Sequence, residues 1–155
     1  MVRNIIAVAV VAFVLFCIPA NAQRNRVADT SYNTVNLPID RDIAYEKVID
    51  FIQNSEYFIV SLYRESGFIQ AKTFREYKKT LSSKDGERIT LNFVVHYMIP
   101  RSSKIVLSIY REEFFSANSA DSASTYNYRE LGVSEDRSLY KEILDRIKQY
   151  IKKEL

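Results

Sequence analysis

The sequence predicts an α+β fold in which two helices pack on one face of an antiparallel sheet. Two patterns carry the prediction: apolar residues at helical spacing near both ends of the domain, and apolar residues at alternate positions between them. Strands joined by short turns pair in sequence order, and both helices need the same apolar sheet face. The expected order is helix, four strands, helix; an additional strand near Tyr32–Leu37 is left open.

Residues 1–22 predict a secretory signal peptide. Arg3 precedes an apolar run from Ile5 to Ile18, and Ala20-Asn21-Ala22 has the small residues of a cleavage site. This run is shorter than the roughly 20 residues that a helix needs to span a bilayer. We therefore expect cleavage after Ala22 and export, to the periplasm or the extracellular space. An association with the outer membrane is left open.

Two alternatives to cleavage concern the same segment. One is an uncleaved anchor. The other is lipidation of Cys17, which the bulky Phe16 before it disfavours. Once the segment is processed, we expect an attachment to a membrane only if Cys17 is lipidated. Beyond this segment the chain has no cysteine, so no disulfide is expected and the core must stabilise the fold.

Residues 23–37 are expected to form an N-terminal tail, and residues 38–155 a single domain. Without residues 1–22, which contain one basic and no acidic residue, the formal net charge falls from +3 to +2. The charges are dispersed, which gives no strong attraction to nucleic acid. The sequence leaves the oligomeric state undetermined.

The helices are expected near residues 40–54 and 135–154, with Asp40 and Ser134 as capping residues. The first carries an apolar face at Ala44, Val48, Phe51 and Ile52. The second has an unbroken apolar stripe formed by Leu139, Tyr140, Ile143, Leu144, Ile147, Tyr150, Ile151 and Leu155.

Four strands are predicted between the helices: 57–63, 68–77, 88–99 and 104–114. Alternation places Phe58, Val60 and Leu62 on one face of the first. The expected turns are Tyr63–Gly67, where Gly67 supplies a positive φ, Asp85-Gly86 as a tight hairpin, and Pro100–Ser103. Residues 113–130 contain a run of small polar residues and are expected to form a mobile loop. The Tyr63–Gly67 stretch is interpreted as a turn rather than a site.

The element order and the segment "AYEKVIDFIQNSEYFIVSLYRESGFIQAK" resemble the small helix-grip or TBP-like domains of bacterial envelope proteins, as in BamC-type lipoproteins. The resemblance covers about residues 45–155 and rests on an amphipathic helix, a strand and the hairpin around Gly67. It implies an αβββ(β)α domain, and a function that is partner binding or unassigned. It transfers no catalytic residue to this chain.

The sequence offers little for catalysis. His96 is the only histidine, which disfavours a Ser–His–acid triad and, without cysteines, a zinc site. The glycines are isolated, so no phosphate-binding loop is present. Acidic pairs occur at Asp40/Asp42, Glu112/Glu113 and Glu135/Asp136; the first and last suit helix starts. We expect no enzyme, cofactor or metal, with a hydrolase using surface carboxylates as a remote alternative.

The remaining candidate is the sheet face opposite the helices, where exposed aromatic residues among polar ones favour a binding surface. The residues taken as candidates are Tyr63, Phe68, Phe74, His96 and Tyr110. Alternation assigns this face twelve residues: Tyr63, Phe68, Gln70, Lys72, Phe74, Asn92, Val94, His96, Met98, Val106, Ser108 and Tyr110.

Two interpretations of this face stay open: it binds a partner, or the 113–130 loop, with Phe114, Phe115, Tyr126 and Tyr128, folds over it. The sequence therefore predicts a non-enzymatic exported binding or assembly module of the bacterial envelope, recognising an envelope protein. The alternative is a carrier that holds a small apolar ligand or lipid between the sheet and a helix. RNA binding is disfavoured, because the predicted element order does not match that of RNA-binding sheets.

Overall fold

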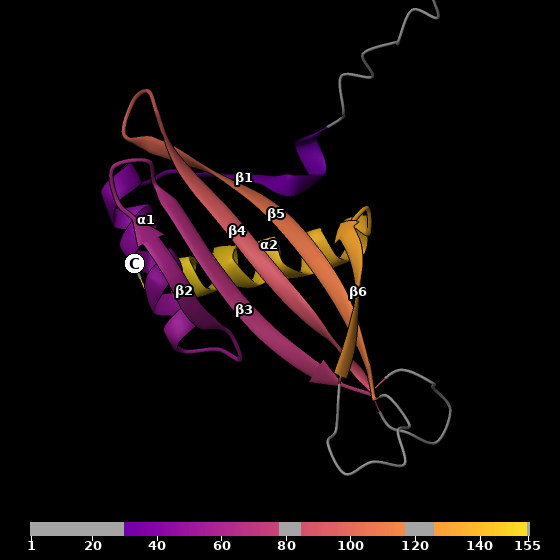
Figure 1. The fold of residues 1–155 in the computed structure, drawn as a ribbon. Helices are drawn as coiled ribbons and strands as arrows, with labels where there is room; N and C mark the ends of the chain where they lie inside the picture. The colour runs from indigo at the N-terminus through magenta and orange to yellow at the C-terminus, as the bar shows by residue number, and fades with distance from the viewer. Residues whose placement is uncertain (1–29, 78–84, 117–125, 155) are drawn as a thin grey trace, which may run out of the picture.

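The computed structural model describes residues 30–77, 85–116 and 126–154 (Figure 1). A short 3₁₀ turn at Thr30–Asn33 leads into β1, and the chain ends in a long helix. The elements are β1 (Thr34–Leu37), α1 (Arg41–Gln53), β2 (Phe58–Tyr63), β3 (Phe68–Glu76), β4 (Gly86–Met98), β5 (Ser102–Ser116), β6 (Tyr126–Val133) and α2 (Arg137–Lys153). The expected signal peptide and Cys17 lie outside the described residues. Within the described residues, no helix is long and apolar enough to cross a bilayer.

The six strands form one antiparallel sheet in the order β1-β5-β4-β3-β2, with β6 also paired to β5. Strand β5 is 15 residues long, and β4 pairs with residues 102–114 along one edge. Two strands share the other edge of β5. Strand β1 pairs with residues 103–106, and β6 pairs with residues 110–116. Strand β5 is therefore the central strand on which the rest of the sheet is assembled.

Both helices lie on the same face of the sheet, as predicted (Figure 1). Nine strand residues that face them are 0–1% exposed: Ile69, Ala71, Ile89, Leu91, Phe93, Val95, Ile105, Leu107 and Ile109. Helix α1 buries Ala44, Tyr45, Val48, Phe51 and Ile52, and α2 buries Leu139, Tyr140, Ile143, Leu144, Ile147 and Ile151. The α+β class is thus confirmed, and the described residues form six strands where four or five were expected.

Residues 113–130 do not form one long loop. Residues 113–116 continue β5, and residues 126–130 begin β6, which pairs with them. Only residues 117–125, between the two strands, lie outside the described residues. The prediction gave weight to the small polar residues in the middle, whereas the flanking aromatic residues are paired across the strands.

The predicted caps are corrected at both helices. Asp40 occupies the N-cap position of α1, but its side chain makes no capping hydrogen bond, and its backbone oxygen accepts from Ala44 N at 2.9 Å. At α2 the cap is Asp136, whose Oδ1 accepts from Ser138 N at 3.0 Å. Ser134 instead lies two residues earlier, and its Oγ accepts from Asp136 N at 3.3 Å.

Asp85 and Gly86 do not form the expected tight hairpin, because both belong to paired backbone. Tyr77 N donates to Asp85 O at 2.8 Å, and Gly86 pairs with Glu76 at the start of β4. A Cβ on Gly86 would lie 2.3 Å from Arg75 O and 2.6 Å from the Phe114 ring. The glycine is therefore explained by a close approach of neighbouring strands rather than by turn chemistry.

The predicted alternation of β2 fails in the middle of the strand. The register with β3 jumps from Ile59–Ala71 to Ser61–Gln70, so Val60 is an extra residue and forms a β-bulge. Phe58 consequently faces away from the helices, and Leu62, opposite Ile69, faces them. Phe58 and Leu62 therefore do not share a face, because one inserted residue reverses the alternation.

An ion pair joins the loop between α1 and β2 to helix α2. The Arg146 guanidinium of α2 donates to both carboxylate oxygens of Glu56 at 2.7 and 2.8 Å. This hydrogen-bonded pairing lowers the pKa of Glu56 to about 2. Arg146 also lies over the Phe51 and Tyr57 rings, with its Cζ 5.6 and 5.9 Å from the ring centroids. The pair fixes the α1–β2 connection against α2.

The Tyr63–Gly67 stretch is a turn that α1 holds in place. The Arg41 guanidinium donates to the backbone oxygens of Arg64 and Glu65, and its Nε donates to Val95 O at 3.2 Å. Gly67 has a φ of 73°, and its carbonyl accepts from Val95 N at 3.0 Å. The turn is thus tied by its backbone atoms, without using the Glu65 carboxylate.

We predict that Gly67→Val lowers the free energy of unfolding by at least about 2 kcal/mol. A Cβ at this position would lie 2.3 Å from Val95 O, and the positive φ disfavours a β-branched residue. Urea unfolding measures the effect. Glu65→Ala serves as the control, because Arg41 binds only the Glu65 backbone, and a shift within about 0.5 kcal/mol is expected. A loss of partner binding by Glu65→Ala at unchanged stability would contradict the assignment as a turn.

Candidate binding surface

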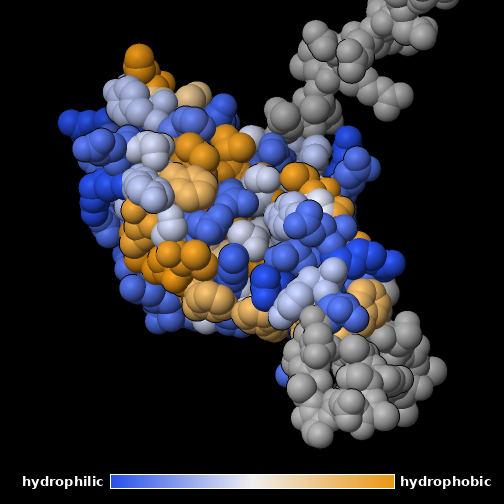
Figure 2. Space-filling view, in the orientation of Figure 1, coloured by the Kyte–Doolittle hydropathy of each residue, from blue (hydrophilic) through white to orange (hydrophobic). Residues whose placement is uncertain are grey.

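The sheet has one face that no described element covers, which we call the open sheet face (Figure 2). Cross-strand partners point to the same side, so the register defines its members. One row runs through Tyr63, Phe68, Val94 and Val106, and the next through Gln70, Asn92 and Ser108. All twelve residues that alternation assigned to this face lie on it. Figure 2 shows apolar and polar groups intermixed across it.

The five candidate residues lie on this face but do not form one cluster. Tyr63 and Phe74 are 63% and 51% exposed. His96 is exposed, whereas Phe68 and Tyr110 are half-buried. They belong to separate groups. Tyr63 pairs with Phe68, Tyr110 contacts Glu130, and His96 lies opposite Lys104 on the neighbouring strand. Phe74 belongs to a group whose other members the sequence analysis did not propose as candidates.

Tyr63 and Phe68 form an aromatic pair at the β2–β3 end of the face, with ring centroids 6.1 Å apart. Beside them, Gln70 Nε2 donates to Asn92 Oδ1 at 2.8 Å across β3 and β4. An open hollow of about 420 Å³ borders the turn and is lined by Leu62–Ser66. This end of the face thus combines aromatic contact area with an ordered polar row.

A second group is an aromatic–arginine stack across four strands. The Phe58 and Phe74 rings are stacked, with centroids 6.2 Å apart and an interplanar angle of 9°. The Arg88 guanidinium lies over both Phe74 and Tyr128, at 5.1 and 4.9 Å from their centroids. Arg88 Nη1 also contacts Glu112 Oε2 at 3.4 Å. Cation–π contact and the ion pair together fix the guanidinium on the sheet.

Sequence reasoning missed three members of this stack: Phe58, Arg88 and Tyr128. Phe58 was assigned to the opposite face because the bulge was not foreseen. Tyr128 was assigned to a loop, although it pairs with Phe114 on β5. Arg88 precedes Ile89 on the third predicted strand, and neighbouring residues of a strand point to opposite faces. Its position on the open sheet face could therefore have been recognised.

Tyr110 lies near β6 on the same face. Loss of solvent around the phenol, followed by its hydrogen bond to the Glu130 carboxylate, raises the pKa of Tyr110 above its usual value. In this contact the hydroxyl donates to the Glu130 carboxylate. This holds Tyr110 against the sheet.

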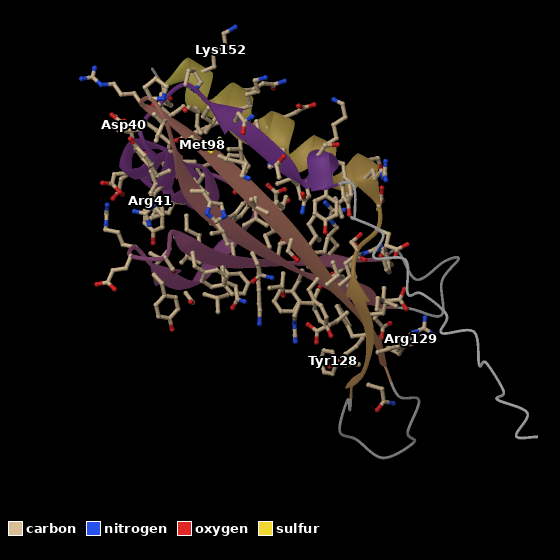
Figure 3. All side chains as sticks on the ribbon, turned by 90° about the horizontal axis from the view of Figure 1, so that it is seen from above. Asp40, Arg41, Met98, Tyr128, Arg129 and Lys152 are labelled. Atoms are coloured by element: carbon tan, nitrogen blue, oxygen red, sulfur yellow. The ribbon has the colours of Figure 1, made fainter. Side chains whose placement is uncertain are left out.

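The acidic pair Glu112/Glu113 is separated by the strand, because consecutive residues point to opposite faces. Glu112 contacts Arg88 on the open sheet face, and Glu113 is 4% exposed on the other side, where Oε2 accepts from Arg129 Nη2 at 2.5 Å. Figure 3 shows the same separation on β6, where Tyr128 and Arg129 point to opposite sides. These two carboxylates cannot act on one substrate.

The two other acidic pairs lie at helix starts: Asp42 contacts Arg41, and Asp136 caps α2. Across residues 30–77, 85–116 and 126–154, no group of three or more histidine, cysteine or acidic side chains is placed to hold a metal ion. The described arrangement on the open sheet face is one of contact surfaces: aromatic rings, amides and an arginine.

Comparison with known proteins gives no further assignment. No family model matches the chain, and no curated protein matches it.

Proposed function

We propose that this protein is a non-enzymatic binding or assembly module of the bacterial envelope, and that it recognises a protein partner with its open sheet face. The observation that carries the proposal is the aromatic and arginine side chains on a face that no described element covers. Phe58, Phe74 and Tyr128 are 49%, 51% and 55% exposed, which is unusual for residues with this much apolar surface.

The chemistry of the face suits a protein partner. Tyrosine, phenylalanine and arginine are enriched in protein interfaces, where rigid rings supply contact area at low entropic cost. Arg88 is already positioned between Phe74 and Tyr128, so little side-chain entropy remains to be lost on binding. The Gln70–Asn92 row adds amides that can hydrogen-bond to a partner's backbone.

The alternative function, a carrier of a small apolar ligand, needs a cavity between sheet and helices. Side chains that line a cavity of ligand size have surface that a water molecule or ligand can contact. Nine strand residues at the centre of the helix-side face are 0–1% exposed, and Ala44, Val48 and Ile52 of α1 are 0% exposed. This close packing favours the binding module over the carrier.

We predict that the variant Tyr63→Ala/Phe74→Ala/Tyr110→Ala loses the partner proteins that wild type captures by crosslinking in envelope extracts. Truncating three interface aromatics costs about 1–4 kcal/mol per residue where they contact a partner centrally. The matched control is Lys148→Ala/Gln149→Ala, two exposed residues of α2, which should capture the same proteins as wild type. Quantitative mass spectrometry of the crosslinked species is the measurement.

Capture of the same proteins by the triple variant would exclude the open sheet face as the binding surface. Thermal unfolding of both variants, monitored by circular dichroism, separates lost binding from lost folding. A lipid that co-purifies in native mass spectrometry would instead support the carrier.

The envelope location rests on residues 1–22, which lie outside the described residues. We predict that the protein recovered from an expressing bacterium begins at Gln23, because Ala20-Asn21-Ala22 precedes the expected cleavage position. Intact-mass spectrometry measures this directly. A mass that includes diacylglycerol on Cys17 would make the protein membrane-anchored, and an intact N-terminus in the cytosolic fraction would contradict export.

A further inference from the structure

The two outer edges of the sheet differ in how they are protected. On the β5 side, β1 is four residues long, and β6 carries Arg129 and Glu130. On the other side, β2 pairs with β3 and with no other described strand, and its sequence, FIVSLY, contains no charge and no proline. Very short strands, charges, proline and β-bulges are what normally keep an edge from pairing with another chain. Strand β2 has six residues, no charge and no proline, and of these devices it has only the bulge at Val60.

The exposure of β2 matches that of an unpaired edge. Phe58, Val60, Leu62 and Tyr63 are 49%, 43%, 43% and 63% exposed. These are four of the six residues of the strand, and all are apolar or aromatic. The strand thus presents an outer edge that pairs with no other described strand, with large side chains on both of its faces.

The β-bulge gives this edge a particular symmetry. Val60 is the inserted residue, and Ser61 beside it pairs with Gln70 at the centre of the strand. Moving outward in either direction, the next residue faces the helices: Ile59 on one side, Leu62 on the other. The residue after that faces the open sheet face: Phe58 on one side, Tyr63 on the other. The order of faces is therefore the same when the strand is read in either direction.

This palindromic order is the condition for antiparallel pairing of the strand with itself. In a two-fold pair, residues equally far from the centre lie opposite each other, and opposite residues must point to the same face. A register shifted by one residue would place helix-side residues against open-face residues. A regular strand meets the condition only when its centre lies on a residue, whereas β2 meets it between Val60 and Ser61.

We infer that β2 is a dimerisation edge, and that its partner is β2 of a second copy of this chain in antiparallel orientation. The pairing joins two sheets into one twelve-stranded sheet with the helices of both copies on the same side. The opposite residues are Phe58 with Tyr63, Ile59 with Leu62, and Val60 with Ser61, each pair occurring twice.

The side chains at these positions suit the pairing. Ile59 with Leu62 extends the helix-side apolar surface across the interface, and Phe58 with Tyr63 is an aromatic cross-strand pair, which stabilises antiparallel strands. Within one chain, Phe58 stacks on Phe74 and Tyr63 contacts Phe68. The dimer would bring one such pair from each copy together on the open sheet face. The inference does not depend on what that face binds.

Sedimentation equilibrium of the native protein tests the inference. Wild type should be a two-chain species that dissociates on dilution. Val60→Lys should weaken the dimer about tenfold or more, because it places charges beside the two-fold axis of an otherwise uncharged edge. The matched control is Val133→Lys on β6, which is 61% exposed at the opposite edge and should leave the dimer unchanged.

A one-chain wild type up to millimolar concentration, or a dimer that persists in Val60→Lys, would overturn the inference. Species larger than two chains would overturn a closed two-fold pair. Disulfide formation provides a test that does not depend on Val60→Lys folding. In a Cys17→Ser background, Phe58→Cys and Tyr63→Cys chains should crosslink to each other when mixed, and much less when each is oxidised alone. Equal crosslinking in all three samples would contradict the register.

Discussion

One buried hydroxyl group completes the edge of the central strand. On the outer edge of β5, β1 ends its pairing at Val106 and β6 begins at Tyr110, which leaves a gap between the two. Ile109 lies in this gap, and its N–H donates to the Tyr140 hydroxyl at 3.1 Å, while its carbonyl accepts from Ser134 N at 2.7 Å. Tyr140 is 1% exposed. A polar backbone group buried without a partner is costly, so this contact allows two strands to share one edge.

The position of α2 follows from the same contact. Tyr140 lies in the first turns of the helix, and its ring packs edge-on against Tyr32 with centroids 5.1 Å apart. With α2 fixed at the β5 edge, α1 occupies the rest of that face, where Phe51 contacts Tyr150. Both helices are used on one side of the sheet. No described element covers the other side, and the aromatic residues there are the basis of the proposed binding role.

At the end of the sheet where Glu87 and Glu113 lie, ion pairs rather than helix residues contact the strands on the helix side. Glu87 and Glu113 are directly opposite on β4 and β5, and both are buried. Arg111 Nη2 lies 2.5 Å from Glu87 Oε2, and Arg129 Nη2 lies 2.5 Å from Glu113 Oε2. Two like charges in a cross-strand pair would repel each other, and the arginines offset this. The long β4–β5 ribbon can thus extend with acidic residues on its helix side.

The sequence predicted the features that depend on the local spacing of apolar residues, and it missed those that depend on the pairing of distant strands. The stripe on α2 up to Ile151, the alternation of β3, β4 and β5 and the turn at Gly67 each depend on neighbouring residues, and the structure confirms them. Leu155, the last residue of the predicted stripe, lies outside the described residues. The bulge at Val60 and the pairing of β6 depend on distant strands, so local alternation gave the wrong face for Phe58 and a loop for Tyr128. The aromatic–arginine stack was missed for this reason, although Arg88 was on a predicted strand.

Tyr140→Phe is the most direct test of the shared β5 edge, because it removes the hydroxyl and keeps the ring. The Ile109 amide would lose its partner in a buried site, and we expect the free energy of unfolding in urea to fall by about 1–3 kcal/mol. Tyr150→Phe is the control on the same helix: its hydroxyl accepts from Asn54 Nδ2 at 3.1 Å at a partly exposed position, so the loss should be smaller. Equal stability of Tyr140→Phe and wild type would contradict the role assigned to this hydroxyl.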